Sequence, residues 1–150
     1  MTKHIDKSGS YRFTLDKKGQ ELEIVGRFHL TGNQVCRWDI EIIHAAPNTT
    51  SKTNIKGVVD DSARAFVNGI IKVLPAAAGT EAFLEERILL VSENAKAEAT
   101  PNLEIETDEV HCSHAATVGK IDEEEIFYLQ SRGIKLKQAK EMIAGGFLSI

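Results

Sequence analysis

The sequence lacks the features that would assign it to several large functional classes. Its two cysteines, Cys36 and Cys112, lie far apart, so they predict no disulfide framework and favour a reducing cytosol. No G-x-x-x-x-G-K-[ST] loop is present, and we therefore expect the chain neither to bind nor to hydrolyse a nucleotide. The first residues, MTKHIDKSGS, lack the apolar core of a signal peptide, and no apolar run could span a bilayer. These absences predict a soluble cytoplasmic protein with no membrane partner.

The charge pattern excludes one more class. The chain carries 18 Lys and Arg against 22 Asp and Glu, a net charge of −4, without the basic clusters that nucleic-acid recognition requires. Charged and apolar fractions of 27% and 42% are those of an ordinary globular protein. A chain of 150 residues is also long enough for one domain with a real core. We expect a globular protein with no nucleic-acid partner.

Short extended segments separated by turns occupy most of the chain before residue 120. The clearest places Cys36, Trp38, Ile40 and Ile42 on one face of a strand. The turns carry Gly, Asn and Asp, including Gly19 and a cluster at residues 48–51. Residues 80–87 (TEAFLEER) are predicted to form one or two helical turns. This pattern indicates an all-β body, which could be a sandwich, a barrel or a stacked solenoid.

The last thirty residues are predicted to form two helices. Asp122 precedes three glutamates, which is typical of an N-cap and an acidic first turn, and Gly133 suits the left-handed position after a helix end. Residues 126, 127 and 129 should form the apolar face of this first helix. A second helix is expected at residues 136–147. A hairpin of this size is not stable alone, so it must pack on the β body or on a partner.

Between these two regions, an alternating strand segment carries a thiol and an imidazole. Successive side chains of a strand point to opposite faces, so Cys112 and His114 should share one face while His111 and Ser113 occupy the other. Transition metals and iron–sulfur species prefer thiolate and imidazole ligands to hard oxygen ligands. The pair is therefore the main candidate for chemistry.

The same region carries a family resemblance. The segment CSHAATVGKIDEEEIFYLQSRGI resembles the C-terminal signature of the SufB/SufD family of iron–sulfur cluster assembly scaffolds. SARAFVNGIIKV, ERILLVSENAKAEATPNLEIETDEV and RGIKLKQAKEMI match the same family in the same order. The resemblance implies a right-handed parallel β-helix, here its end portion at residues 1–120, followed by a C-terminal helical segment at residues 121–150. Members of the family carry an N-terminal helical region and further coils that would precede this part.

The resemblance also implies site residues and partners. His114 falls on the histidine associated with nascent clusters at the SufB–SufD junction, where it would bind iron or handle a proton. Cys112 would be an auxiliary group, and the iron–sulfur cluster would be transient and held only in the complex. The expected partners are the ATPase SufC and either SufB or a second SufD-like copy. The helical segment would dock SufC through four residues: Phe127, Tyr128, Arg132 and Ile134.

Two other readings of these residues remain open. In one, the chain is a non-catalytic oligomerisation module that binds SufC without touching iron or sulfur. In the other, it is a solenoid or cupin-like metal enzyme, which would need more ligands converging on Cys112 and His114. The other candidate residues have simpler structural interpretations. We interpret Cys36 as a core residue, His111 as an exposed residue, and Glu104, Glu106, Asp108 and Glu109 as a solvated face. His4, His29 and His44 belong to no group of candidate site residues.

Overall fold

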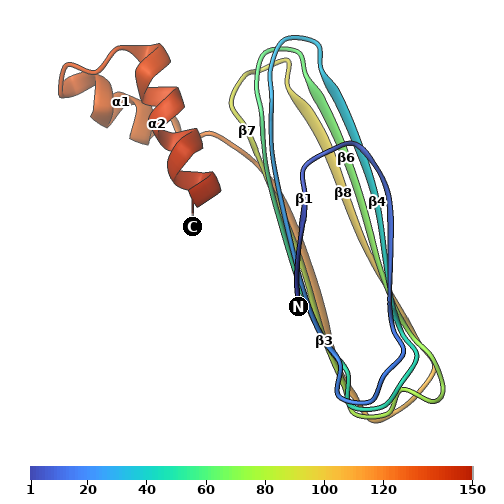
Figure 1. Cartoon of the computed structure of the whole chain (residues 1–150). Helices are drawn as coiled ribbons and strands as arrows, with labels where there is room; N and C mark the ends of the chain where they lie inside the picture. Colours follow the sequence, from blue (N-terminus) through green and yellow to red (C-terminus); the bar gives the residue numbers. More distant parts are fainter. Residues whose placement is uncertain (150) are drawn as a thin grey trace.

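The structure is a computed structural model, and it describes residues 1–149, which wind into a flattened coil with two helices at one end (Figure 1). One sheet has the strand order β1-β3-β5-β7-β9 and the other β2-β4-β6-β8. The strands are β1 (Thr2–Ile5), β2 (Gly9–Leu15), β3 (Glu21–Leu30), β4 (Val35–His44), β5 (Thr50–Val59), β6 (Arg64–Val73), β7 (Thr80–Leu90), β8 (Lys96–Ile105) and β9 (Val110–Lys120). The helices are α1 (Glu123–Ser131) and α2 (Leu136–Ser149).

Each strand pairs in parallel with the strand one coil earlier in the same sheet. In the five-stranded sheet, for example, Glu21 pairs with Thr50 and Thr50 pairs with Glu81. Consecutive strands belong to opposite sheets, so the chain crosses from one sheet to the other at every turn. Gly19 has a positive φ of 72° in one such turn, as its predicted turn role requires. The prediction of an all-β body built as a parallel solenoid is confirmed.

The core lies between the inner faces of the two sheets. The predicted alternation of β4 is confirmed, because Trp38, Ile40 and Ile42 are all completely or almost completely buried. The ring of Phe28 packs edge-on against Trp38, with ring centroids 5.1 Å apart. It also covers Gly57, where a Cβ atom would lie only 1.9 Å from the ring. Gly57 therefore provides the space that this aromatic pair occupies.

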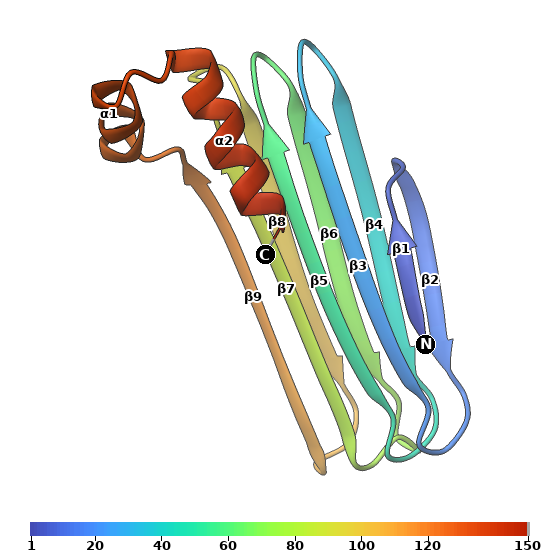
Figure 2. The ribbon, with the colours of Figure 1, turned by 60° about the vertical axis from the view of Figure 1, so that its left-hand side comes forward.

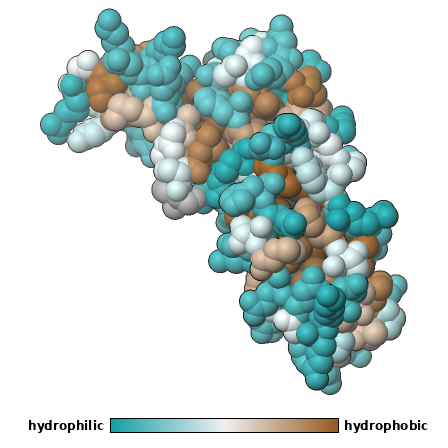
Figure 3. All heavy atoms as spheres, in the orientation of Figure 1, coloured by the Kyte–Doolittle hydropathy of each residue, from teal (hydrophilic) through white to brown (hydrophobic). Residues whose placement is uncertain are grey.

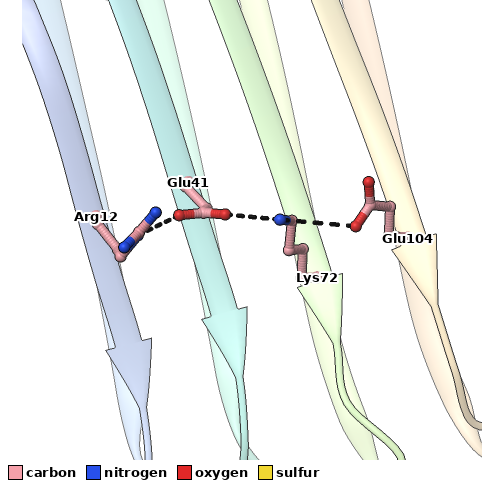
Figure 4. Close-up of polar contacts among 4 residues, drawn as sticks. All are labelled: Arg12, Glu41, Lys72 and Glu104. Atoms are coloured by element: carbon pink, nitrogen blue, oxygen red, sulfur yellow. Dashed lines mark hydrogen bonds and ion pairs between the residues drawn. The ribbon is translucent and has the colours of Figure 1, made fainter.

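The outer face of the four-stranded sheet carries a row of alternating charges (Figure 4). Arg12 pairs with Glu41, the Lys72 Nζ lies 2.8 Å from the other Glu41 oxygen, and Lys72 also lies 3.8 Å from Glu104. Hydrogen bonds from Lys72 and then from Arg12 lower the pKa of Glu41. Each residue of the row comes from a different coil, so the row joins four successive strands of one sheet. Exposed pairs of this kind add little stability each, but they favour this alignment of the coils.

The prediction of helical turns at residues 80–87 is wrong, because these residues begin β7. Thr80, Ala82, Leu84, Glu86 and Ile88 are buried on the inner face, while the residues between them are exposed. The glutamates of this segment suggested a helix, but a period of two between buried positions is the period of a strand.

The two helices are confirmed, and one of them packs on the outer face of the five-stranded sheet (Figure 2). The Asp122 side chain accepts a hydrogen bond from the Glu124 N–H at 2.8 Å, and Gly133 has a φ of 87°. Ala144 of α2 joins Val58 and Val91 in a small second core. This contact fixes the hairpin on the solenoid. No helix of residues 1–149 is long and apolar enough to cross a membrane.

Cations surround the end of α2 where it meets the sheet. The Arg27 Nε donates to the Leu148 carbonyl at 3.2 Å, and the Lys56 and Arg87 cations lie 5.8 and 5.5 Å from the centre of the Phe147 ring. The three cations occupy paired positions on adjacent strands. A helix C-terminus carries partial negative charge, so it is a favourable neighbour for this row of like charges. The hairpin thus attaches by apolar packing together with cation contacts.

Candidate functional site

The candidate site lies at the end of the solenoid where the coil stops. β9 is the last strand of its sheet and β8 the last of the other, and both stand at the same end of the stack (Figure 2). Within residues 1–149, no further strand pairs with either edge. Apolar residues of this last coil are correspondingly exposed, Ile105 to 42% and Val118 to 40%. The inner face of the last coil is therefore open on one side.

Strand register shows which residues of β9 face this open end. Cys112 pairs with Ala82 and His114 with Leu84, and both partners on β7 are buried on the inner face. Side chains at paired positions lie on the same face of a sheet. The structure thus brings Cys112, half-buried, and His114, exposed, together on the inner face of the last strand. His111 lies on the outer face.

The two thiols differ in their surroundings. Burial raises the pKa of the Cys112 thiol, an effect that a hydrogen bond with the Ala82 backbone partly opposes. Cys112 would therefore act as a ligand only after its thiol proton is released to solvent when a metal ion binds. Cys36 is 5% exposed and belongs to the main core, and burial likewise raises the pKa of its thiol. Among residues 1–149, no three His, Cys, Asp or Glu side chains are grouped closely enough to hold a metal ion.

Glu86 is a candidate that the sequence reasoning missed. Its side chain is completely buried on the inner face of β7, and it pairs with Ala116 of β9. Neither carboxyl oxygen has a hydrogen-bond partner among the described residues, and burial raises the pKa of Glu86 to about 8. The available signal was the alternation of β7, which places a carboxyl group where Ala82 and Leu84 would predict an apolar side chain.

His44 is another buried titratable group of the core, and its two ring nitrogens both have hydrogen-bond partners. Nδ1 lies 2.8 Å from the Thr49 hydroxyl and Nε2 lies 2.8 Å from the Ser51 hydroxyl. The Thr49 hydroxyl also lies 3.2 Å from that of Thr80, one coil further on. Burial lowers the pKa of His44 to about 4. This cluster joins neighbouring coils at one corner of the solenoid, so we assign His44 a structural role.

The helical hairpin exposes the residues predicted to contact a partner. Phe127 is 74% and Tyr128 56% exposed, Ile134 is half-buried, and the Arg132 guanidinium lies 5.2 Å from the centre of the Tyr128 ring. The predicted apolar face of α1 is wrong at Phe127, because the single buried residue of that helix is Ile126. Figure 3 shows apolar surface on the hairpin, set among hydrophilic residues. An exposed apolar patch of this kind marks a surface for interaction.

Comparison with known proteins shows which family the chain is similar to. Residues 8–147 match the family model described as the SufBD core domain of SUF system FeS cluster assembly. The chain is 41% identical over 115 residues to the iron–sulfur cluster assembly protein SufD of Escherichia coli (strain K12), covering 77% of this chain and 27% of that protein. It is 37% identical over 126 residues to SufD of Bacillus subtilis (strain 168), covering 84% and 28%. A SufBD family protein of Mycobacterium leprae (strain TN) is 33% identical over 138 residues, covering 86% and 35%. The chain therefore spans 27 to 35% of the length of these relatives.

Proposed function

The chain belongs to the SufBD family of iron–sulfur cluster assembly proteins, and we propose that it acts as a non-enzymatic scaffold subunit on which nascent clusters form. The observation that carries this proposal is the position of His114. Its imidazole faces the open end of the last coil, where a second subunit could reach it. The two free thiols suit the reducing cytoplasm, where we place the protein.

In this proposal the open end is a subunit junction. The free edges of β8 and β9 present unpaired backbone N–H and C=O groups, which another solenoid end could pair with. The occupant would be SufB or a second copy of a SufD-like chain. His114 would bind iron or move a proton at this junction, with Cys112 as an auxiliary thiol. The cluster would be cargo, held transiently by ligands from both subunits.

A substitution of His114 tests this role. His114→Ala should leave folding and complex formation intact, because the exposed imidazole packs little, and it should lower cluster yield at least several-fold. The measurement is the visible absorption of the complex after anaerobic reconstitution with iron and sulfide. His111→Ala, on the outer face of the same strand, is the matched control. An unchanged cluster yield in an intact His114→Ala complex would show that the imidazole has no part in assembly.

We further propose that residues 121–150 dock the ATPase SufC, while residues 1–120 form the scaffold core. Support comes from the exposed aromatic residues of α1 beside Arg132, since aromatic residues and Arg are frequent anchors of protein interfaces. The chain itself would bind no nucleotide. The double variant Tyr128→Ala, Arg132→Glu should weaken SufC capture in a pull-down. Lys137→Glu, at an exposed position of α2, is the control for charge reversal. Equal capture of both variants would remove this hypothesis.

A second candidate function is an interaction module that binds SufC without touching iron or sulfur. The raised pKa of the Cys112 thiol favours it, because a protonated thiol is a poor ligand. Anaerobic reconstitution with and without a SufB partner separates the candidates. A cluster that forms only with SufB supports the scaffold, no cluster under either condition supports the module, and one stable metal ion on the chain alone supports a metal enzyme.

A further inference from the structure

Glu86 is a buried carboxyl group that the fold of the core does not explain. Its side chain is 0% exposed, and neither of its oxygens has a hydrogen-bond partner among residues 1–149. His44, another buried titratable side chain of the core, has both ring nitrogens 2.8 Å from hydroxyl groups. A buried carboxyl group without a partner destabilises a core, so such a group is a candidate for a functional role.

The core makes room for this carboxyl group. Gly69 lies opposite it on β6, and a Cβ atom at that position would come within 2.5 Å of Glu86 Oε1. On the neighbouring strand the paired residue is Ala116, whose methyl group is the smallest side chain available. Gly69 and Ala116 are thus small neighbours on two sides of the carboxyl group, which is completely buried beside the last coil. Glu86 lies one strand inside the open end.

Strand register relates Glu86 to His114. On β9, Ala116 pairs with Glu86 and His114 pairs with Leu84. His114 therefore lies two residues before the position paired with Glu86, on the same inner face of the sheet. Adjacent strands are about 4.8 Å apart and rise about 3.3 Å per residue, so the two Cα atoms are separated by about 8 Å. Long side chains can bridge a diagonal of this length. The carboxyl group and the imidazole can therefore meet when the imidazole turns inward.

We propose that Glu86 is a positioning residue for His114, accepting a hydrogen bond from one ring N–H while the other ring nitrogen binds iron. This inference rests on the proposed function of His114. Metal-binding histidines usually donate their second N–H to a carboxylate or carbonyl, which sets the tautomer and the ring orientation.

The test measures iron dependence in the assembled complex with SufB-type and SufC-type partners. Cluster formation is followed by absorption as Fe(II) is varied at fixed sulfide under anaerobic conditions. Glu86→Met keeps an apolar side chain of similar length and removes both oxygens, while Glu86→Gln keeps one acceptor. We expect Glu86→Met to raise the half-saturating Fe(II) concentration about 10- to 100-fold, with a smaller rise for Glu86→Gln and no loss of the plateau. Glu85→Gln, on the exposed outer face of β7, is the charge-matched control.

Combination with His114→Ala shows whether Glu86 acts through the imidazole. The double variant should be no worse than His114→Ala alone, because a positioning residue has no effect once its target is gone. An unchanged half-saturating concentration in both Glu86 variants, or losses that multiply in the double variant, would overturn this inference while leaving the role of His114 intact. If His114→Ala itself has no effect, the proposed function fails instead.

Discussion

Two buried titratable groups of the core, Glu86 and His44, should give the protein an unusual stability profile between pH 4 and pH 8. Burial raises the pKa of Glu86 from 4.5 to about 8. Its contribution to stability is therefore fully present below pH 4.5 and is lost as the pH rises through 8, because the folded protein must then bury a charge. Burial lowers the pKa of His44 from 6.5 to about 4. Its contribution is present above pH 6.5 and is lost as the pH falls through 4.

The two pKa shifts determine how much the free energy of unfolding changes with pH. Each group changes the free energy of unfolding by about 1.4 kcal/mol per pH unit within its window. Between pH 4.5 and 6.5 the two slopes have opposite signs and cancel, so the free energy of unfolding should be nearly constant. Between pH 6.5 and 8 only Glu86 acts, and the free energy of unfolding should fall by about 2 kcal/mol. In Glu86→Gln this fall should disappear, and a rise of about 3 kcal/mol from His44 should appear between pH 4 and 6.5.

Urea unfolding at constant ionic strength measures this profile at pH 4.5, 5.5, 6.5, 7.25 and 8. The wild-type chain and Glu86→Gln are compared at each pH, with Glu85→Gln as the control on the exposed face of the same strand. The control should follow the wild type. A wild-type free energy of unfolding that stays level from pH 6.5 to 8, or a Glu86→Gln profile parallel to the wild type, would refute the assignment of Glu86 as a neutral buried acid.

Two further predictions concern packing. Gly57→Ala places a Cβ atom in the ring of Phe28 and should lower the free energy of unfolding by about 1–3 kcal/mol. Gly119→Ala is the control, because a Cβ atom there meets no atom within 4 Å, and it should leave the free energy of unfolding unchanged. Equal urea midpoints for the two variants would contradict this packing. Phe147→Ala removes the half-buried ring that joins α2 to the sheet, so hydrogen exchange should speed up in α2 by the equivalent of about 1–2 kcal/mol while the strands stay protected. Phe127→Ala, on an exposed ring, is its control, and an α2 exchange rate that matches this control would show that the ring does not hold the hairpin.

The sequence predicts a strand correctly where the buried positions carry apolar residues, and it fails where the buried positions carry polar residues. In β4 every second residue from Cys36 is apolar and buried, so period and structure agree. The sequence predicts a turn at residues 48–51, because these residues are small and polar, but β5 begins within this segment at Thr50. The structure shows the reason: Thr49 and Ser51 face inward, where they bind the two nitrogens of His44. A polar network between distant residues makes the start of a strand look like a loop.

The candidate site could likewise be predicted only in part from the sequence. Alternation alone placed Cys112 and His114 on one face, because a shared face depends only on the spacing of two residues on one strand. Their exposure could not be predicted from that spacing, since it depends on β9 being the last strand of its sheet. The relation of Glu86 to His114 could not be predicted either, because it exists only through the pairing of β7 with β9. Properties that arise between coils are invisible in a local pattern.

The termination of the coil explains why His114 is exposed. One column of the five-stranded sheet runs through Ile24, Thr53, Leu84 and His114, each paired with the next. The first three are at most 2% exposed, whereas His114, which occupies the same inward position, is exposed. An imidazole at any earlier place in the column would be enclosed by the opposite sheet and would need internal partners, as His44 does. At the last coil it stays exposed, as the proposed role at a subunit junction requires, and the adjacent strand carries the buried carboxyl group of Glu86. Under the proposed function, a further coil added after β9 would cover His114, so anaerobic reconstitution of that variant complex should give no visible cluster absorption even though every residue of the present chain is kept.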